Sequence, residues 1–236
     1  MTIEEHVPLG PYSTLHVGGP ARFFVRVTGL SNLKRALSWT EDRRVPWFIL
    51  GGGANFFCRD EGFPGLVIKM ENRALSFDQN EMTAGAGVLT RISVGKAVER
   101  GFRGMEHLAG IPGTIGGAVR GNAGAFGMET RDHLARVHVL ARTARGWEEN
   151  IIPREQLFFA YRDSTFKREK GRYVIWSATF SLPSGNRAEG ERLVAGDLEE
   201  RKKRQPYEFP SIGSVFKNPA PERPAGQLIE GAGLNG

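Results

Sequence analysis

The sequence is poor in cysteine: Cys58 is the only one in 236 residues, so no disulfide can form within the chain. A lone cysteine fits a reducing compartment and favours a small, partly buried side chain over a reactive one. No apolar run approaches the roughly 20 residues of a membrane-spanning helix. The first residues also lack the pattern of a signal peptide. The sequence therefore predicts a cytoplasmic protein without a membrane partner.

Common motifs of nucleotide, metal and hydrolytic enzymes are missing as well. The glycines after Leu50 do not continue into a helix, as the G-x-G-x-x-G dinucleotide motif requires, and no G-x-x-x-x-G-K-[ST] motif is present. The five histidines lack the spacing of metal ligands, and one cysteine cannot build a zinc site, so we predict no metal. No G-x-S-x-G elbow supports a Ser-His-Asp hydrolase.

The composition is that of an ordinary globular protein, with 40% hydrophobic and 25% charged residues. The formal net charge is +6 and the isoelectric point is about 9.7. The basic residues are not gathered in one long run. This distribution favours an anionic small molecule over nucleic acid as the partner.

Glycine, by contrast, is concentrated in two places. Eight of the twenty-four residues in the segment 104–127 are glycine, and Gly51, Gly52 and Gly53 follow an apolar run. Such runs are needed where the backbone adopts positive φ or approaches another group closely. Their free N–H groups can form concave anion sites. Either segment alone could be a tight turn; together they favour a phosphate-bearing ligand, and a flavin dinucleotide is the simplest candidate.

Periodicity and turn signals predict an α+β fold. We expect the segment 104–127 to be a loop, Ser31 to cap the first helix, and Pro153 to begin a short helix ending near Tyr161. A break at residues 183–185 divides the chain into predicted domains 1–184 and 185–236. The expected strands are 21–27, 46–50, 66–68, 81–87, 135–141, 147–151 and 173–182, and the longer helices are 31–43, 88–100 and 187–204, the last ended by Pro206.

Five segments match, in order, the motifs of one bacterial enzyme family. They are LGGGAN at 50–55, GMEHLAGIPGTIGGA at 104–118 with NAGA at 122–125, YRDSTF at 161–166, RQP at 204–206 with PSIGSVFKNP at 210–219, and AGQLIEGAGL at 225–234. On these segments the chain resembles the UDP-N-acetylenolpyruvoylglucosamine reductases, also called UDP-N-acetylmuramate dehydrogenases, of peptidoglycan synthesis. The resemblance runs from near Tyr12 to the last residue.

The resemblance implies a vanillyl-alcohol-oxidase-like (PCMH-type) FAD-binding domain of two α+β subdomains, followed by a substrate domain. It implies that NADPH reduces the bound FAD, which then reduces the enolpyruvyl ether of UDP-N-acetylglucosamine to UDP-N-acetylmuramate. The residues expected to line the cofactor are Gly51, Gly52, Gly53, Ala54, Asn55, Ile111, Pro112, Gly113, Thr114, Gly116, Gly117, Ala118, Asn122 and Gly124.

The resemblance also assigns two catalytic residues. Ser214 matches the serine that protonates the substrate carbon, which a neutral hydroxyl can do only if its surroundings polarise it; alternatively it is an ordinary turn serine. Arg162 matches an arginine whose fork can bind the substrate carboxylate; alternatively it forms a surface ion pair with Asp163 or Glu155. Further substrate-binding candidates are Lys217 and Asn218 for the UDP end, and Tyr161, which either packs beside the substrate or belongs to the core.

The chain departs from the family at its C-terminal side. The family continues for several dozen residues and has a catalytic glutamate there, which no glutamate of this chain, Glu230 included, matches. After Gly185 we expect one good helix, a loop and a short apolar helix, hence an incomplete substrate domain with exposed apolar surface and reduced or absent activity.

No tyrosine-bearing insertion is visible between residues 173 and 187, so the chain resembles the shorter type of the family. The remaining alternatives are a catalytically impaired FAD-binding fragment of this enzyme and another oxidoreductase on the same flavin fold. We expect a monomer.

Overall fold

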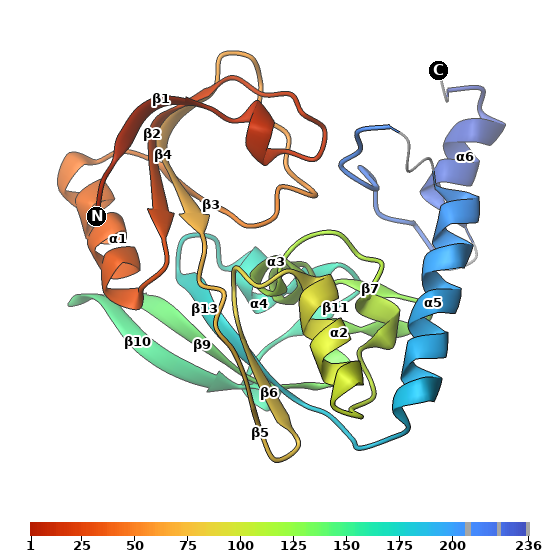
Figure 1. The fold of residues 1–236 in the computed structure, drawn as a ribbon. Helices are drawn as coiled ribbons and strands as arrows, with labels where there is room; N and C mark the ends of the chain where they lie inside the picture. The colour runs from red at the N-terminus through yellow and green to blue at the C-terminus, as the bar shows by residue number, and fades with distance from the viewer. Residues whose placement is uncertain (206–208, 221–222, 235–236) are drawn as a thin grey trace.

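The computed structural model describes residues 1–205, 209–220 and 223–234, and builds them around two β-sheets (Figure 1). The first sheet has the strand order β1-β2-β4-β3. Strands β2, β4 and β3 are parallel, and β1 is antiparallel to β2. Its strands are β1 (Glu4–Pro8), β2 (Pro20–Val27), β3 (Trp47–Leu50) and β4 (Phe63–Met70), and the short helical turn η1 (Gly10–Tyr12) follows β1.

Helix α1 (Leu30–Arg43) covers this sheet with the face predicted from its periodicity, because Leu33, Ala36 and Leu37 are fully buried. The predicted capping residue was wrong. Gly29, not Ser31, is the N-cap, and no side chain caps the helix there. The helix ends where Arg44 adopts the left-handed conformation, with φ +53°.

The second sheet is antiparallel and has the order β10-β9-β13-β6-β5. The predicted hairpin over residues 135–151 is confirmed as β9 and β10. The two sheets share one hydrophobic core, and the rings of Trp47 and Trp147 meet edge to face across it with centroids 5.8 Å apart. The strands are β5 (Leu75–Asp78), β6 (Glu81–Gly85), β9 (Leu134–Thr143), β10 (Gly146–Pro153) and β13 (Tyr173–Ser181).

The glycine-rich segment 104–127 is more regular than expected, because it contains a helix. Helix α3 (Ile115–Gly121) packs on β13 and β6 by burying Ile115, Ala118 and Val119. The other elements here and next to it are α2 (Thr90–Glu99), η2 (Glu106–Leu108), β7 (Gly124–Ala125), β8 (Met128–Glu129) and η3 (Thr130–Asp132). In α3, burial of the stripe formed by Ile115, Ala118 and Val119 outweighs the low helix propensity of its glycines.

The short helix predicted from Pro153 was also wrong. Pro153 is the last residue of β10, and only the turn η4 (Arg154–Gln156) follows it. The next residues bury Leu157 and Phe159, which alternate as in an extended chain. They lead into β11 (Phe159–Ala160), which pairs with β12 (Asp163–Ser164) before helix α4 (Thr165–Arg168).

The predicted helix 187–204 is confirmed as α5 (Arg187–Arg204), which runs along one side of the molecule, at the right in Figure 1. Leu193, Val194 and Leu198 are only half-buried, and the buried residues of this face are Gly190 and Asp197. The Asp197 carboxylate lies 2.6 Å from Nδ1 of His107 in η2. The predicted stop, Pro206, lies outside the described residues.

Beyond α5 the chain forms an irregular loop, residues 209–220, and helix α6 (Ala225–Gly231). The expected exposed apolar surface is present here, because the side chains of Phe209, Val215, Phe216 and Leu234 are mostly exposed. Among the described residues, no helix is long and apolar enough to cross a membrane.

Candidate functional site

The fold brings the two glycine-rich segments into direct contact. A Cβ atom on Gly51 would lie 2.6 Å from Oγ1 of Thr114, and one on Gly52 would lie 2.8 Å from Cα of Gly113. A side chain at either position would therefore push the segments apart. The two predicted cofactor segments thus meet at residues 51–54 and 113–114.

The first glycine turn follows β3 at the carboxyl edge of the parallel strands, where open α/β sheets commonly bind ligands. Gly53 has φ +71°, and its Cβ would lie only 1.8 Å from the carbonyl oxygen of Tyr12. Within the described residues, the backbone N–H groups of Gly52, Gly53 and Ala54 donate to no acceptor. They are free to bind an anion.

Two polar side chains beside these turns, the buried Thr114 and the half-buried Lys69, have fewer polar partners than their surroundings favour. Oγ1 of Thr114 has no hydrogen-bond partner. Lys69, at the end of β4, donates to the carbonyl of Gly51 and forms no ion pair with a described carboxylate. Burial lowers the pKa of its ammonium group. A half-buried cation without an ion-pair partner, beside free N–H groups, is the environment that a diphosphate would stabilise.

Lys69 also lines a cavity of about 300 Å³ together with Tyr12, Thr14 and Gly52. Neither Lys69 nor Thr14 was singled out from the sequence. The available signal was one lysine at the carboxyl end of the otherwise apolar run 66–70. Its meaning depends on the strand order, which places β4 next to β3.

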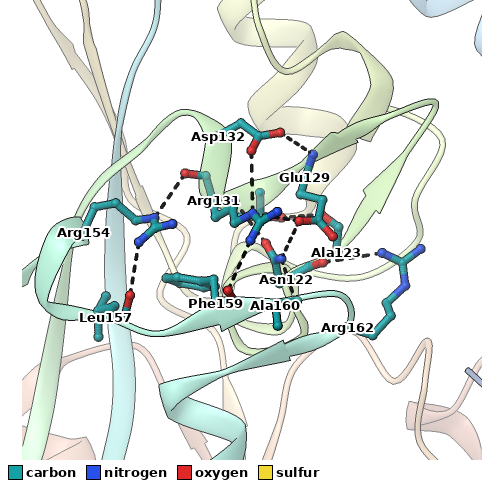
Figure 2. Close-up of polar contacts among 11 residues, drawn as sticks. Asn122, Ala123, Glu129, Arg131, Asp132, Arg154, Leu157, Phe159, Ala160 and Arg162 are labelled. Atoms are coloured by element: carbon teal, nitrogen blue, oxygen red, sulfur yellow. Dashed lines mark hydrogen bonds and ion pairs between the residues drawn. The ribbon is translucent and has the colours of Figure 1, made fainter.

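Asn122, a predicted cofactor residue, is fully buried and adopts the left-handed conformation that ends α3, with φ +44°. Its Nδ2 donates to Oε2 of Glu129 at 2.9 Å and to the carbonyl of Ala160 at 3.0 Å (Figure 2). Its Oδ1 accepts the N–H of Arg131 at 3.2 Å. The side chain thus holds the β7–β8 and β11–β12 hairpins together, and its contact with a cofactor stays a prediction.

Arg162 lies at the tip of the β11–β12 hairpin with φ +52°, an unusual conformation for a residue with a side chain. Its guanidinium donates to the carbonyl oxygen of Gly124 at 2.7 Å. It also donates to the carbonyl oxygen of Asn122 at 3.4 Å (Figure 2). It forms no ion pair with a described residue, and Asp163 pairs instead with Arg168 at 2.9 Å. Residues held in such strained conformations are concentrated at functional sites.

One lysine contacts this arginine, and a second, Lys217, lies within electrostatic range of the first. Nζ of Lys167 donates to the carbonyl of Arg162 at 3.0 Å. Burial, and then the charges of Lys217 and Arg120, lower the pKa of the Lys167 ammonium group. The hydrogen bond from Arg168 is the main cause that holds the pKa of the Asp163 carboxyl below its usual range, and the charge of Lys217 acts in the same direction. Lys217 therefore lies near α4 and the hairpin of Arg162.

Of the remaining predicted residues, Ser214 and Asn218 lie on the loop 209–220, and Tyr161 lies in the turn between β11 and β12. Ser214 is exposed and follows Gly213, whose φ is +71°. Oδ1 of Asn218 accepts the N–H of Ala225 at 3.0 Å, at the start of α6. Tyr161 is 46% exposed, which excludes the alternative that it belongs to the core.

A buried carboxylate supports the start of the second glycine segment. Glu106 is only 3% exposed and accepts hydrogen bonds from Nε of Arg103 and, at 2.7 Å, from the N–H of Gly104. Arg103 also binds Oε2 of Glu189 in α5 at 2.7 Å. Burial raises the pKa of Glu106, but these hydrogen bonds outweigh it, so the net shift is downward.

We expect Glu106→Gln to lower the free energy of unfolding at pH 7 by about 2 kcal/mol, because it removes the buried, charged acceptor of two partly buried donors. A depressed carboxyl pKa contributes stability that is present above the unfolded-state pKa, about 4.3, and is lost as the pH falls through the folded-state pKa. The difference in the free energy of unfolding between the variant and the unmodified chain should therefore shrink in acid. Urea unfolding at several pH values measures this, with the exposed Glu99→Gln as control; an equal difference at every pH would contradict it.

Two family models match the chain. An FAD binding domain matches residues 21–146, and the C-terminal domain of UDP-N-acetylenolpyruvoylglucosamine reductase matches residues 205–236. The UDP-N-acetylenolpyruvoylglucosamine reductase of Synechococcus sp. (strain WH7803) is 37% identical over 238 residues, which cover 99% of this chain and 76% of that protein. The enzyme of the same name from Chlamydia trachomatis serovar L2 is 38% identical, with coverages of 100% and 78%.

Solved structures agree with these sequence matches. The crystal structure of UDP-N-acetylenolpyruvylglucosamine reductase (MurB) from Thermus caldophilus superposes with a TM-score of 0.84 and 35% identity, and covers 100% of this chain and 82% of that one. A cholesterol oxidase from Brevibacterium sterolicum has a TM-score of 0.57 and 11% identity over 78% of this chain and 38% of its own, and shares the fold alone.

These matches confirm both the resemblance found in the sequence and the expected α+β flavin fold. FAD is the cofactor of this protein. The chain spans about three quarters of the length of the curated relatives it matches. The chain belongs to the UDP-N-acetylenolpyruvoylglucosamine reductase family of FAD-dependent oxidoreductases.

Proposed function

We propose that this protein uses NADPH and FAD to reduce UDP-N-acetylglucosamine enolpyruvate to UDP-N-acetylmuramate, a precursor of peptidoglycan. The names of its relatives support the substrate. A cytoplasmic location follows from the proposal, since NADPH and UDP-sugars are cytoplasmic metabolites. We assign cofactor binding to residues 1–184 and further substrate contacts to residues 185–236.

One observation carries the proposal for the substrate: cations from the β11–β12 hairpin, α4 and the loop 209–220 lie within electrostatic range of one another. They are Arg162, Lys167 and Lys217, and the nearby Asp163 is already paired with Arg168. Like charges repel one another, so such a cluster is costly without an anion. The proposed substrate carries two anionic groups, a carboxylate and a diphosphate, and matches this surplus of positive charge.

The structure fits FAD at the contact between the glycine segments. The free N–H groups of Gly52, Gly53 and Ala54 would hold its diphosphate, and the charge of Lys69 would balance it. When bound, FAD supplies the redox chemistry, taking a hydride from NADPH and passing it to the vinyl carbon of the substrate. The remaining polar atom, Oγ1 of Thr114, would gain a partner.

Arg162 is suited to hold the substrate carboxylate. The carbonyls of Gly124 and Asn122 fix its guanidinium from one side and leave its other N–H groups for a bidentate contact. We assign Lys217 and Asn218 to the UDP diphosphate, and Tyr161 to packing against the substrate. Ser214 donates its proton to the carbon next to the reduced one, so that hydride and proton together saturate the double bond.

The proposal is tested by following flavin colour in the purified chain without oxygen. We expect a yellow protein that NADPH bleaches and that the enolpyruvyl substrate restores, whereas UDP-N-acetylglucosamine without the enolpyruvyl group does not. Bleaching without recovery would favour the catalytically impaired FAD-binding alternative. A colourless protein that does not bind added FAD would contradict the proposal.

A further inference from the structure

The loop that carries Ser214 is attached to the first glycine turn by polar contacts. Oγ1 of Thr14 donates to the carbonyl of Ser211 at 2.5 Å, and the N–H of Ser211 donates back to the carbonyl of Thr14 at 3.2 Å. Nδ2 of Asn55 donates to the carbonyl of Ile212 at 3.1 Å. We call these contacts the serine-loop clamp, formed by Thr14 and Asn55 on one side and residues 211–212 on the other.

The clamp is continuous with the glycine turn. The N–H of Thr14 donates to the carbonyl of Gly53 at 3.2 Å, and a Cβ on Gly53 would meet the backbone of residues 12–13. Asn55 is itself the last residue of the turn motif. A shift of this turn would therefore move both donors of the clamp.

Apolar burial does little to hold this loop, because Phe209, Val215 and Phe216 are mostly exposed. Hydrogen bonds instead define its path. Oγ of Ser211 accepts the N–H of Gly213 at 3.1 Å, and Gly213 turns the chain with φ +71°. Consecutive Cα atoms are about 3.8 Å apart, so Ser214 lies within about 8 Å of the Ile212 anchor. The clamp thus limits where the Ser214 hydroxyl can be.

We propose that Thr14 and Asn55 are positioning residues for the reduction of the substrate, which hold the serine loop against the turn that binds the cofactor. This rests on the proposed role of Ser214. NADPH needs only the flavin, whereas the substrate step also needs the serine at its place. The clamp should therefore affect the second half-reaction and spare the first.

Thr14→Val tests the clamp, because valine keeps the shape and the backbone bonds but lacks the hydroxyl. We expect reoxidation of the reduced flavin by the enolpyruvyl substrate to slow about fivefold, the factor for one ordinary hydrogen bond, with little change in reduction by NADPH. Thr14→Ser should restore the rate. Thr143→Val is the matched control, since Oγ1 of Thr143 donates to the carbonyl of Gly146 in the β9–β10 turn. Equal loss in both half-reactions, or none, would overturn the proposal.

A second measurement does not depend on turnover. Amide hydrogen exchange in residues 209–216 should accelerate about fivefold in Thr14→Val, and should stay unchanged in Thr14→Ser and Thr143→Val. Unchanged exchange in Thr14→Val would overturn the clamp by itself.

Ser214→Ala separates the two proposals. If it blocks reoxidation while Thr14→Val has no effect, the proposed function stands and the clamp fails. If it leaves reoxidation unchanged, the role of Ser214 fails instead. Where both variants act, the double variant should be no slower than Ser214→Ala, because Thr14 acts through the serine.

Discussion

Ser214→Ala is expected to slow reoxidation of the reduced flavin by the enolpyruvyl substrate by about 10²- to 10⁴-fold, the range that a positioned general acid supplies. Reduction of the flavin by NADPH should be nearly unchanged, since that step needs no proton from Ser214. The flavin spectrum and the affinity for FAD should also stay the same, because Ser214 is exposed on a loop. Stopped-flow absorbance of each half-reaction, measured without oxygen, separates the two steps.

The matched control is Ser76→Ala, an exposed serine of β5 on the outer strand of the second sheet. It should leave both half-reactions unchanged. Exchange of solvent deuterium into the product would be informative as well, because a serine donor predicts that the proton on the second carbon comes from exchangeable hydrogen. A Ser214→Ala variant with an unchanged reoxidation rate would show that another group supplies this proton.

Gly53→Ala is expected to have the largest structural effect. The residue has φ +71°, which costs a side chain about 1 kcal/mol, and the new Cβ would lie 1.8 Å from the carbonyl oxygen of Tyr12. Relieving that clash requires movement of the segment that carries Thr14. We expect this movement to lower the free energy of unfolding by about 3 kcal/mol more. The turn would also lose the geometry of its N–H groups, so FAD affinity should fall at least about tenfold.

Gly127→Ala isolates the contribution of the clash. Gly127 has φ +81°, similar to Gly53, but a Cβ there would meet no atom within 4 Å. The free energy of unfolding of this variant should fall by only about 1 kcal/mol, the cost of a side chain at positive φ. Urea unfolding and titration of flavin fluorescence measure both effects. Similar losses in the two variants would show that Gly53 is needed for its dihedral angle alone.

Elements with strong periodicity could be predicted from the sequence. The helix at 31–43 and the long strand at 173–182 are where their patterns placed them, because each presents apolar side chains to the core. The helix at 187–204 is also where its pattern placed it, although its apolar residues are only half-buried. Helix α3 could not be predicted in the same way. Its glycines disfavour a helix locally, and only tertiary burial of Ile115 and Val119 reveals it.

The candidate site was predicted only in part for a similar reason. The two glycine segments stood out in the sequence, and the structure brings them into contact at Gly51 and Thr114. Lys69 and Thr14 carried no local signal, because their importance comes from strand order and from contacts between distant segments. The roles assigned to Ser214 and Arg162 come from the family motif, and they stay predictions until the half-reactions are measured.

The bonds between Thr14 and Ser211 join residues 197 positions apart in the chain. Closing so long a loop costs much conformational entropy, while the bonds gained are few and exposed. During folding this junction is therefore expected to form late, after the sheets have condensed. A molecule caught before that last event would already be coloured by its flavin and yet unable to finish its reaction, so colour alone is a poor measure of how much of a preparation is fully folded.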